Sequence, residues 1–223
     1  YACHADKYDR LIQREDYQQN ILKVIQSIVN LQNKDTLDIG AGTGRLSSIL
    51  APFVRTITAM DLSLPMIQLA RNALKKSKPE NWQLAVGDNA FLPIKDKSFD
   101  LVVSGWSFCY LAVWGGEQWQ TRLQSGLSSI KRVLRESGCI ILLETLGTGF
   151  ESPNPPAHLN AYFNYLTECG FMHKWMRTDY QFKSLAEAEE LADFFFGDDL
   201  VKKVAKNQWV ILPECTGIWW LMT

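Results

Sequence analysis

Short apolar runs alternate with segments of helical periodicity from about residue 16 to residue 145. Apolar residues recur at helical spacing from Leu123 to Leu134, before a helix stop at residues 135–138, and a further helix is predicted at about 16–31. This alternation predicts a parallel sheet with helices on both faces. The runs that predict buried strands span residues 54–60, 82–86, 99–104 and 139–145.

Three alternate glycines follow one further predicted strand. Leu37, Asp38 and Ile39 have the character of a buried strand end, and the chain continues Gly-Ala-Gly-Thr-Gly-Arg. Glycine lets the main chain approach a ligand without a Cβ in the way, and a helix start adds a partial positive charge. Residues 37–45 therefore predict a loop that binds a nucleotide-type cofactor.

The glycine spacing distinguishes between kinds of nucleotide loop. A dinucleotide fingerprint counted from Gly40 needs its third glycine at position 45, but the chain has Arg45 there and its glycine one residue earlier, at Gly44. A P-loop needs Gly-Lys followed by Ser or Thr, which this segment lacks. The pattern that remains, Asp-x-Gly-x-Gly-x-Gly, resembles that of the class I S-adenosylmethionine-dependent methyltransferases, of the small-molecule, methyltransferase-11-like type.

The resemblance implies a fold and a cofactor. The implied fold is α/β, a three-layer Rossmann-like sandwich with a mostly parallel seven-stranded sheet and an antiparallel strand pair at the C-terminal end. Such enzymes commonly finish with a helix and that strand pair, which places the helix at 158–169, the strands at 171–182 and 208–221, and an inserted acidic helix at 185–196. The implied cofactor is S-adenosyl-L-methionine, with S-adenosyl-L-homocysteine as its product.

Further residues follow the predicted strands where the family binds its cofactor. Asp61 lies about 20 residues after Gly42, the spacing at which such folds place the acid for the ribose hydroxyls. Asp88 lies where the family has an acid near the adenine amino group, and Ser104 ends the strand that faces the methionine part. The resemblance thus implies these cofactor residues: Asp38, Gly40, Ala41, Gly42, Asp61, Leu62, Met66, Gly87, Asp88, Asn89, Ser104 and, in an N-terminal segment that resembles the family's lid, Tyr8.

Each of these pieces also has a purely structural interpretation. The glycines can form a tight turn, Asp61 can cap the helix that follows it, and Gly-Asp-Asn at 87–89 is common turn chemistry. Their occurrence in the family's order along four strands favours the cofactor interpretation.

The segment after the fourth strand indicates the kind of methyl acceptor. Enzymes of this class that methylate base amines or protein glutamine carry Asn/Asp-Pro-Pro-aromatic there, and cytosine C5 enzymes carry Pro-Cys, whereas residues 104–111 have neither. A small-molecule acceptor is therefore favoured. Trp106 and Tyr110 can form an apolar wall of its pocket or belong only to the core. Arg14, Glu144 and His158 are further candidates on the acceptor side, and no catalytic residue is assigned.

Composition agrees with a single enzyme domain. The 223 residues are 47% hydrophobic, enough for a continuous core, and the net charge of −1 gives no electrostatic sign of nucleic acid binding. No transmembrane segment or leader is visible, and five widely spaced cysteines predict neither disulfides nor a metal site. We expect a cytoplasmic monomer or homodimer, with one domain at 1–223 made of a helical lid (1–31), a cofactor core (32–145) and a substrate-side part (146–223).

The sequence thus predicts a methyltransferase that methylates O, N or C of a small metabolite. Three alternatives stay open: an NAD(P)-dependent oxidoreductase on a similar sheet, a non-catalytic regulatory domain that binds the same cofactor, and an RNA or protein methyltransferase. The acceptor atom, the use of a general base, the oligomeric state and the pathway are not determined by the sequence.

Overall fold

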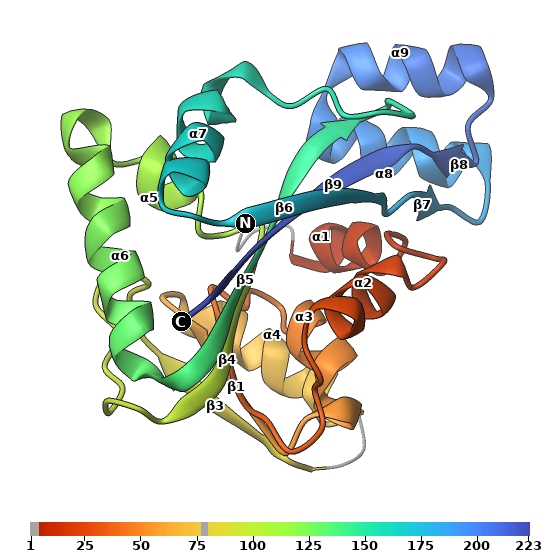
Figure 1. Ribbon diagram of the computed structural model, residues 1–223. Coiled ribbons are helices and arrows are strands. Elements are labelled where there is room, and N and C mark those ends of the chain that lie inside the picture. Colours follow the sequence, from red (N-terminus) through yellow and green to blue (C-terminus); the bar gives the residue numbers. More distant parts are fainter. Residues whose placement is uncertain (1–4, 77–79) are drawn as a thin grey trace. The chain divides into compact units, whose positions relative to one another are not determined.

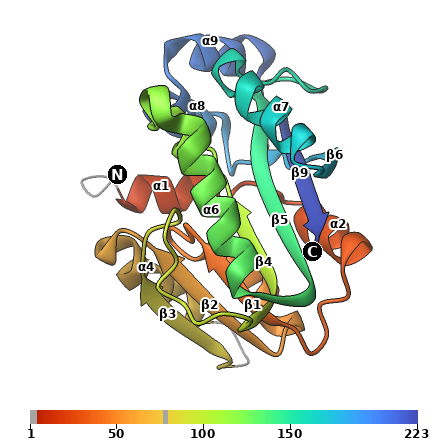
Figure 2. The ribbon, with the colours of Figure 1, turned by 60° about the vertical axis from the view of Figure 1, so that its left-hand side comes forward.

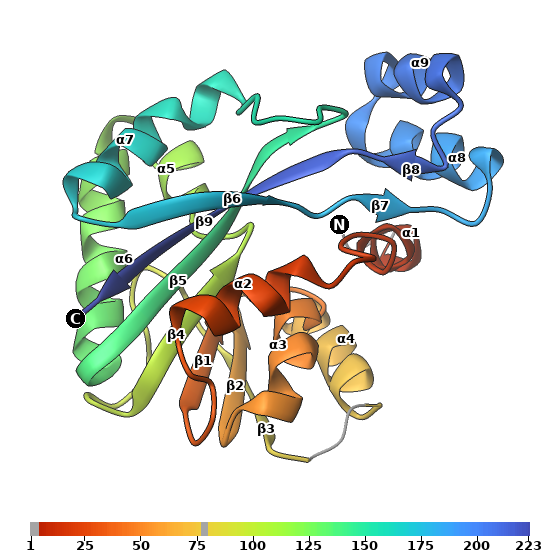
Figure 3. The same cartoon turned by 45° about the vertical axis from the view of Figure 1, so that its right-hand side comes forward.

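Seven strands form one sheet: β1 (Asp35–Ile39), β2 (Thr56–Asp61), β3 (Trp82–Val86), β4 (Phe99–Gly105), β5 (Leu134–Thr148), β6 (Met172–Arg177) and β9 (Glu214–Met222). They belong to a computed structural model that describes residues 5–76 and 80–223, so the first four residues of the predicted lid lie outside the described residues. The strand order is β3-β2-β1-β4-β5-β9-β6 (Figure 1). Strands β1 to β5 pair in parallel, whereas β6 and β9 run in opposite directions (Figure 3).

Helices lie on both faces of this sheet. Helices α3 (Arg45–Leu50) and α4 (Leu64–Leu74) cover one face of strands β1 to β3 (Figure 3), and α6 (Trp119–Val133) lies on the other face of the sheet (Figure 2). The predicted α/β fold, with a mostly parallel seven-stranded sheet and an antiparallel pair formed by its last strands, is confirmed. The remaining elements are α1 (Ala5–Ile12), α2 (Asn20–Ile28), α5 (Tyr110–Val113), α7 (Asn160–Glu168), α8 (Leu185–Phe196), α9 (Asp198–Asn207), β7 (Tyr180–Gln181) and β8 (Ile211–Leu212).

The direction of strand addition reverses between β1 and β4. From β1 the chain adds β2 and β3 on one side, then crosses back to add β4 and β5 on the other. Leu37, Ile39, Val102 and Val103 are fully buried there, as expected of parallel strands covered on both faces. In open α/β sheets, ligands bind at the carboxyl ends of the strands that flank such a reversal. The fold therefore directs attention to the ends of β1 and β4.

The chain forms two compact units, each assembled from separate stretches of sequence. Unit 1 contains the chain up to Val24, Thr145–Pro156 and Trp175–Gly217. Unit 2 contains Ile25–Glu144, Ala157–Lys174 and Ile218–Thr223. Four of the five boundaries fall inside α2, β5, β6 and β9, so these four elements belong partly to each unit. The expectation of one domain made of three successive segments stays a prediction.

Unit 1 joins the N-terminal helix to the acidic helix predicted at 185–196. Arg10 donates to both carboxylate oxygens of Glu190 at 3.1 Å, and Arg14 donates to both oxygens of Glu187 at 3.0 and 3.1 Å. The Arg14 guanidinium thereby lowers the pKa of Glu187 to about 2. Beneath these pairs lies an apolar core, whose buried members are Leu11, Tyr180, Phe182, Ala188, Leu191, Ala192, Leu200, Val204 and Leu212.

The N-terminal helix predicted at 16–31 is shorter in the structure, because Asp16 ends the preceding segment. Asp16 has a φ of 58°, outside the helical region, and its carboxylate accepts from the N–H groups of Asn20 and Ile21 at 2.7 and 3.0 Å. The N–H groups of the first turn of a helix have no partner within the helix, and Asp16 supplies one for α2. Helix α2 therefore begins at Asn20.

The C-terminal strands also differ from the prediction. The predicted strand at 208–221 is divided into β8 and β9 on either side of Pro213, which lacks the N–H that a strand needs, and it follows a helix that was not expected, α9. The predicted strand at 171–182 is likewise divided, into β6 and β7. Strand β3 begins and ends as predicted, and α8 covers the predicted acidic helix. No helix in the described part of the chain has the length and apolar content needed to cross a membrane.

Gly44 allows α3 and α4 to approach each other closely. It has a φ of 82°, and a Cβ built on it would lie 2.9 Å from the Cβ and 3.0 Å from the Cα of Ala70 in α4. Gly42 has a similar φ of 55°, but a Cβ there would meet no atom within 4 Å. A side chain at either glycine would strain the left-handed backbone, but only a side chain at Gly44 would also crowd Ala70. Comparing the two positions therefore separates backbone strain from crowding.

We expect Gly44→Ala to lower the free energy of unfolding by about 2–4 kcal/mol, because left-handed strain of about 1–2 kcal/mol is added to overpacking of similar size. Gly42→Ala, the matched control, adds only the strain of about 1–2 kcal/mol. Urea unfolding followed by circular dichroism measures both variants. Equal losses would show that α4 yields to the added methyl group and that crowding at Ala70 is not a constraint.

Candidate functional site

Residues 40–44, which we call the glycine turn, connect β1 to α3 at the reversal point. A Cβ on Gly42 would face open space, whereas a Cβ on Gly40 would lie 1.8 Å from Ser107 Oγ and 2.9 Å from Asn89 Nδ2. Gly42 therefore leaves room for a ligand to approach the main chain, and Gly40 leaves room for the segment after β4. Gly40 and Gly42 of the predicted cofactor loop are thus required for different physical reasons.

Asp38 is a buried carboxylate with an unsatisfied oxygen. It has no solvent exposure, and its Oδ2 accepts from Ser47 Oγ at 2.6 Å. Its Oδ1 has no hydrogen-bond partner among the residues that the structure describes. Burial raises the pKa of Asp38 to about 7, with a further contribution from the charge of Asp61. An unpaired buried acceptor is costly, which makes this oxygen a place where a cation or donor would be stabilising.

Asp61 connects the end of β2 to the glycine turn. Its Oδ2 accepts from the N–H of Gly42 at 2.9 Å, and its Oδ1 accepts from the N–H of Ser63 at 2.8 Å. Each carboxylate oxygen can accept a second hydrogen bond, so capacity for a ligand's hydroxyl groups remains. After it, Leu62 is 70% exposed and Met66 is half-buried on α4. An apolar side chain with that exposure beside a carboxylate is consistent with a ligand wall.

The loop after β3 forms a tight turn. Asp88 Oδ1 accepts from the N–H of Ala90 at 2.8 Å, the turn chemistry that the sequence allowed. A Cβ on Gly87 would lie 2.7 Å from Met60 Sδ, so this glycine allows the loop to pack closely on β2. The structure therefore supports a structural role for Gly87 and Asp88, and their role in cofactor binding stays a prediction.

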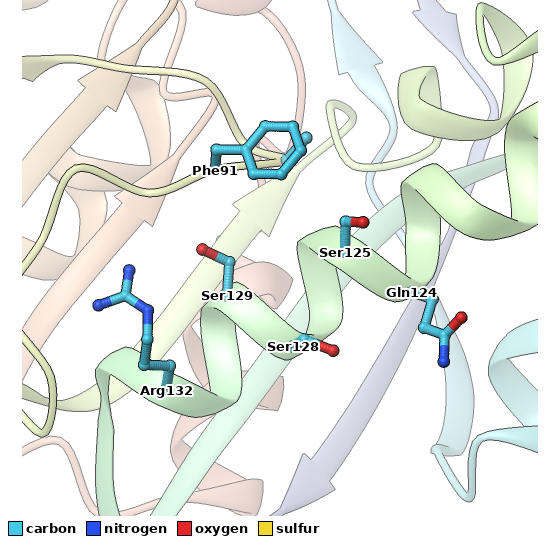
Figure 4. A pocket seen from close by; sticks show the side chains of 7 residues that line it. Phe91, Gln124, Ser125, Ser128, Ser129 and Arg132 are labelled. Atoms are coloured by element: carbon cyan, nitrogen blue, oxygen red, sulfur yellow. The ribbon is translucent and has the colours of Figure 1, made fainter.

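An open groove of about 420 Å³ lies between this loop and α6 (Figure 4). Phe91, 72% exposed, lies above the helix face that carries Ser125 and Ser129. Ser129 Oγ already accepts from the N–H of Leu92, and Arg132 already donates to the carbonyls of Leu92 and Ile94. The predicted cofactor residues do not line this groove, and several of its polar groups are used internally. It is therefore not the candidate site.

The segment after β4 contains a strained residue. Trp106 has a φ of 50°, which is an outlier for a bulky side chain and costs about 1–3 kcal/mol. Its N–H donates to the carbonyl of Leu143 at 2.7 Å, and the Arg45 guanidinium carbon lies 4.8 Å from the centroid of its ring. A guanidinium over an indole face contributes about 0.5–2 kcal/mol, the same order as the strain.

Two serines attach this segment to the end of β1. Ser104 is fully buried, and its Oγ donates to the carbonyl of Ile39 at 3.0 Å. Ser107 Oγ accepts from Asn89 Nδ2 at 3.2 Å and packs on Gly40. The residues predicted after β1, β2, β3 and β4 thus meet through direct contacts within unit 2. The structure places Ser104 as a connection between strands, and its contact with a cofactor stays a prediction.

Glu144 is enclosed by protein donors near the end of β5. It is 1% exposed, and its Oε1 accepts from the N–H of Cys109 at 3.0 Å and from the hydroxyl of Tyr162 in α7 at 3.1 Å. Burial raises the pKa of Glu144 to about 7, and burial together with the Glu144 charge raises the pKa of the Cys109 thiol. The carboxylate holds the start of α5 and the middle of α7 against β5.

Of the other candidates, Tyr110 and His158 for the acceptor belong to unit 2, whereas Arg14 for the acceptor and Tyr8 for the cofactor belong to unit 1. Tyr110 stacks on Trp114 with ring centroids 4.3 Å apart, and His158 is exposed just before α7. Tyr8 packs against Phe195 within unit 1, with centroids 5.8 Å apart, and the Arg14 guanidinium is engaged by Glu187. The roles of all four in binding stay predictions.

Sequence reasoning missed four residues of the site. Ser47, Arg45, Ser107 and Tyr162 make the contacts that hold Asp38, Trp106, Gly40 and Glu144. Arg45 was noticed only as the residue that replaces a third glycine. The other three carry no spacing signal, because each acts across elements. In the described residues, no group of three or more His, Cys, Asp or Glu side chains is arranged to hold a metal ion.

Comparison with known proteins agrees with this arrangement. Residues 37–142 match the family model described as "Methyltransferase domain". A SAM-dependent methyltransferase from Aquifex aeolicus has a similar fold, with a TM-score of 0.59 and 15% identity over 90% of this chain and 88% of that chain.

Two curated relatives are methyltransferases. The demethylmenaquinone methyltransferase of Tropheryma whipplei (strain Twist) is 34% identical over 111 residues, which are 50% of this chain and 41% of the relative. The malonyl-[acyl-carrier protein] O-methyltransferase of Geobacter sulfurreducens is 38% identical over 104 residues, 46% of this chain and 35% of the relative. The matched stretches span less than half the length of these relatives. Strand order, glycine turn and relatives together show that residues 37–142 form a methyltransferase domain similar to those of the class I S-adenosylmethionine-dependent methyltransferases.

Proposed function

We propose that this protein transfers the methyl group of S-adenosyl-L-methionine to an O, N or C atom of a small-molecule acceptor by in-line displacement. The observation that carries the proposal is the unsatisfied oxygen of Asp38, buried beside a turn that is open at Gly42. The proposal includes a cytoplasmic monomer or homodimer that does not act on nucleic acid. The net charge of −1 supports that last point.

The residues present fit this cofactor. S-adenosylmethionine carries an ammonium and a sulfonium group, and the buried Oδ1 of Asp38 is an acceptor without a partner among the described residues. The cofactor also carries ribose hydroxyls, for which Asp61 retains acceptor capacity. Gly42 lets the main chain come close to the ligand. We assign Leu62, Met66, Gly87, Asp88 and Asn89 to its adenosine part.

The remaining proposed contacts surround the methionine part and the acceptor. Gly40, Ala41 and Ser104 lie at the ends of β1 and β4, and Tyr8 is proposed to cover the cofactor. Trp106 and Tyr110 are proposed as the apolar wall for the acceptor, with Arg14, Glu144 and His158 as its polar groups.

The bound cofactor supplies an electrophilic methyl group on a positively charged sulfur. The protein's own contribution is to hold the acceptor close, aligned and away from water. The acceptor atom decides whether a general base is also used. A rigid turn at the end of β1, held by Asp61 and Ser107, provides such fixed positioning.

Calorimetry of the whole chain with S-adenosylmethionine, S-adenosylhomocysteine and NAD tests the proposal directly. We expect the first two to bind at about micromolar strength, equivalent to about −8 kcal/mol, and NAD not to bind. Methyl transfer is then assayed on a panel of small acceptors that includes those named by the two relatives. Binding of NAD alone would favour the oxidoreductase alternative, and cofactor binding without transfer to any acceptor would favour a regulatory domain.

Asp61→Ala is expected to weaken S-adenosylhomocysteine binding by about 1.5–3 kcal/mol, because it removes hydrogen bonds to a charged acceptor. Asp61→Asn keeps an oxygen for the N–H of Gly42 and should lose less. Calorimetry measures both, with Asp193→Asn on the exposed face of α8 as control. An unchanged dissociation constant for Asp61→Ala would remove this residue from the site.

The pKa of Asp38 predicts a pH dependence of binding. Since burial raises the pKa to about 7, the folded protein without cofactor keeps this proton more tightly than the unfolded chain. The contribution of Asp38 to stability is therefore complete below about pH 4 and is lost as the pH rises through 7. The ammonium group that S-adenosylhomocysteine shares with the cofactor favours the carboxylate of Asp38, so the affinity for S-adenosylhomocysteine should rise between pH 6 and 8, by about tenfold at most.

Calorimetry at several pH values checks this expectation. Asp38→Asn should bind more weakly and lose the pH dependence, whereas Glu144→Gln, which removes another carboxyl group with a pKa of about 7, should retain it. The same slope in wild type and Asp38→Asn would contradict the assignment.

A further inference from the structure

Two side-chain contacts connect the glycine turn to the segment after β4. Arg45 follows the glycine turn directly and begins α3, and its guanidinium carbon lies 4.8 Å from the ring centroid of Trp106. At the other end of the turn, Gly40 lies against Ser107, whose Oγ accepts from Asn89. The contacts therefore flank residues 41–44. Trp106 and Ser107 thus contact the two ends of the glycine turn.

Trp106 is suited to respond to a shift of the glycine turn. Its backbone is held in the left-handed region at a φ of 50°, and its N–H is fixed to Leu143 of β5. Because a tryptophan does not favour this conformation by itself, the position of its half-buried ring depends on the contacts around it. The contact recorded on the face of the ring is Arg45.

We propose that Arg45 is a positioning residue for Trp106. A cofactor bound at the glycine turn acts through Arg45 and changes the orientation of the Trp106 indole, which is proposed as part of the acceptor wall. The inference rests on the proposed function and deepens it, since it names the residue that couples cofactor binding to the acceptor wall. Arg45 belongs to the same short segment as Gly42, whose N–H is held by Asp61. A cofactor bound next to Gly42 therefore lies only three residues along the chain from Arg45.

The test combines calorimetry with tryptophan fluorescence, using S-adenosylhomocysteine as the probe. The change in emission at saturation is measured for wild type and Trp106→Phe, and the difference between them is the Trp106 component. Arg45→Met removes the cation but keeps a long side chain, and Arg45→Lys keeps a cation at this position.

We expect wild type to show a Trp106 component. Arg45→Met should bind the probe within about threefold of wild type, a difference of less than about 1 kcal/mol, yet lose more than half of that component. Arg45→Lys should restore most of it. A purely structural role would not give this pattern, because probe affinity and folding are retained while the spectroscopic signal is lost.

The outcomes separate this inference from the proposed function. If calorimetry detects no binding of S-adenosylhomocysteine to wild type, both the inference and the proposed function are overturned. Heat with wild type but no Trp106 component, or a full component in Arg45→Met, overturns the inference alone. If Trp106→Phe does not fold, Trp106→Gly replaces it as the reference, since glycine adopts the left-handed backbone without strain.

Discussion

The structure depends on how the buried end of β1 turns into α3. The chain has to leave a buried strand and enter a helix within a few residues, and its main-chain N–H and C=O groups still need hydrogen-bond partners there. The end of β2 satisfies part of this need, since Met60 accepts from the N–H of Ala41 at 2.9 Å and Asp61 accepts from that of Gly42. The end of β4 adds the contact between Ser104 and Ile39. The turn is therefore held by both neighbouring strands before any ligand binds, which is how a parallel sheet preorganises a binding site.

Two departures from local rules of stability adjoin this turn. Asp38 retains a buried oxygen without a partner among the described residues, and Trp106 holds a backbone conformation that bulky residues avoid. Each departure costs free energy that the surrounding packing has to offset. In proteins, such departures concentrate at functional sites, because a site that has to accept a ligand cannot be fully satisfied without it. The two together support the proposed site at the ends of β1 and β4.

The sequence predicted the architecture well, for reasons that are local. Parallel strands buried on both faces form apolar runs, so the strand predicted at 99–104 matches β4 to within one residue, and the Asp38 to Gly44 pattern indicated the methyltransferase family. The helix at Asn20 could not be delimited, because its start is set by the single carboxylate of Asp16. The same limit applies to the site: the partners of Gly40 and Glu144 come from distant elements and leave no periodicity in the chain.

The small ribbon in unit 1 has a consequence for how this chain can vary. Strands β7 and β8 pair antiparallel, with Tyr180 opposite Leu212 and Gln181 opposite Ile211. The ribbon brings together the two ends of the segment that contains α8 and α9, so this segment is closed at its base. Lengthening or shortening a segment closed in this way changes its loop entropy only slowly and leaves the register of the main sheet untouched. The loops around α8 and α9 can thus change in length at little entropic cost, whereas α8 itself stays tied to α1 and the turn after it by the Arg10–Glu190 and Arg14–Glu187 pairs.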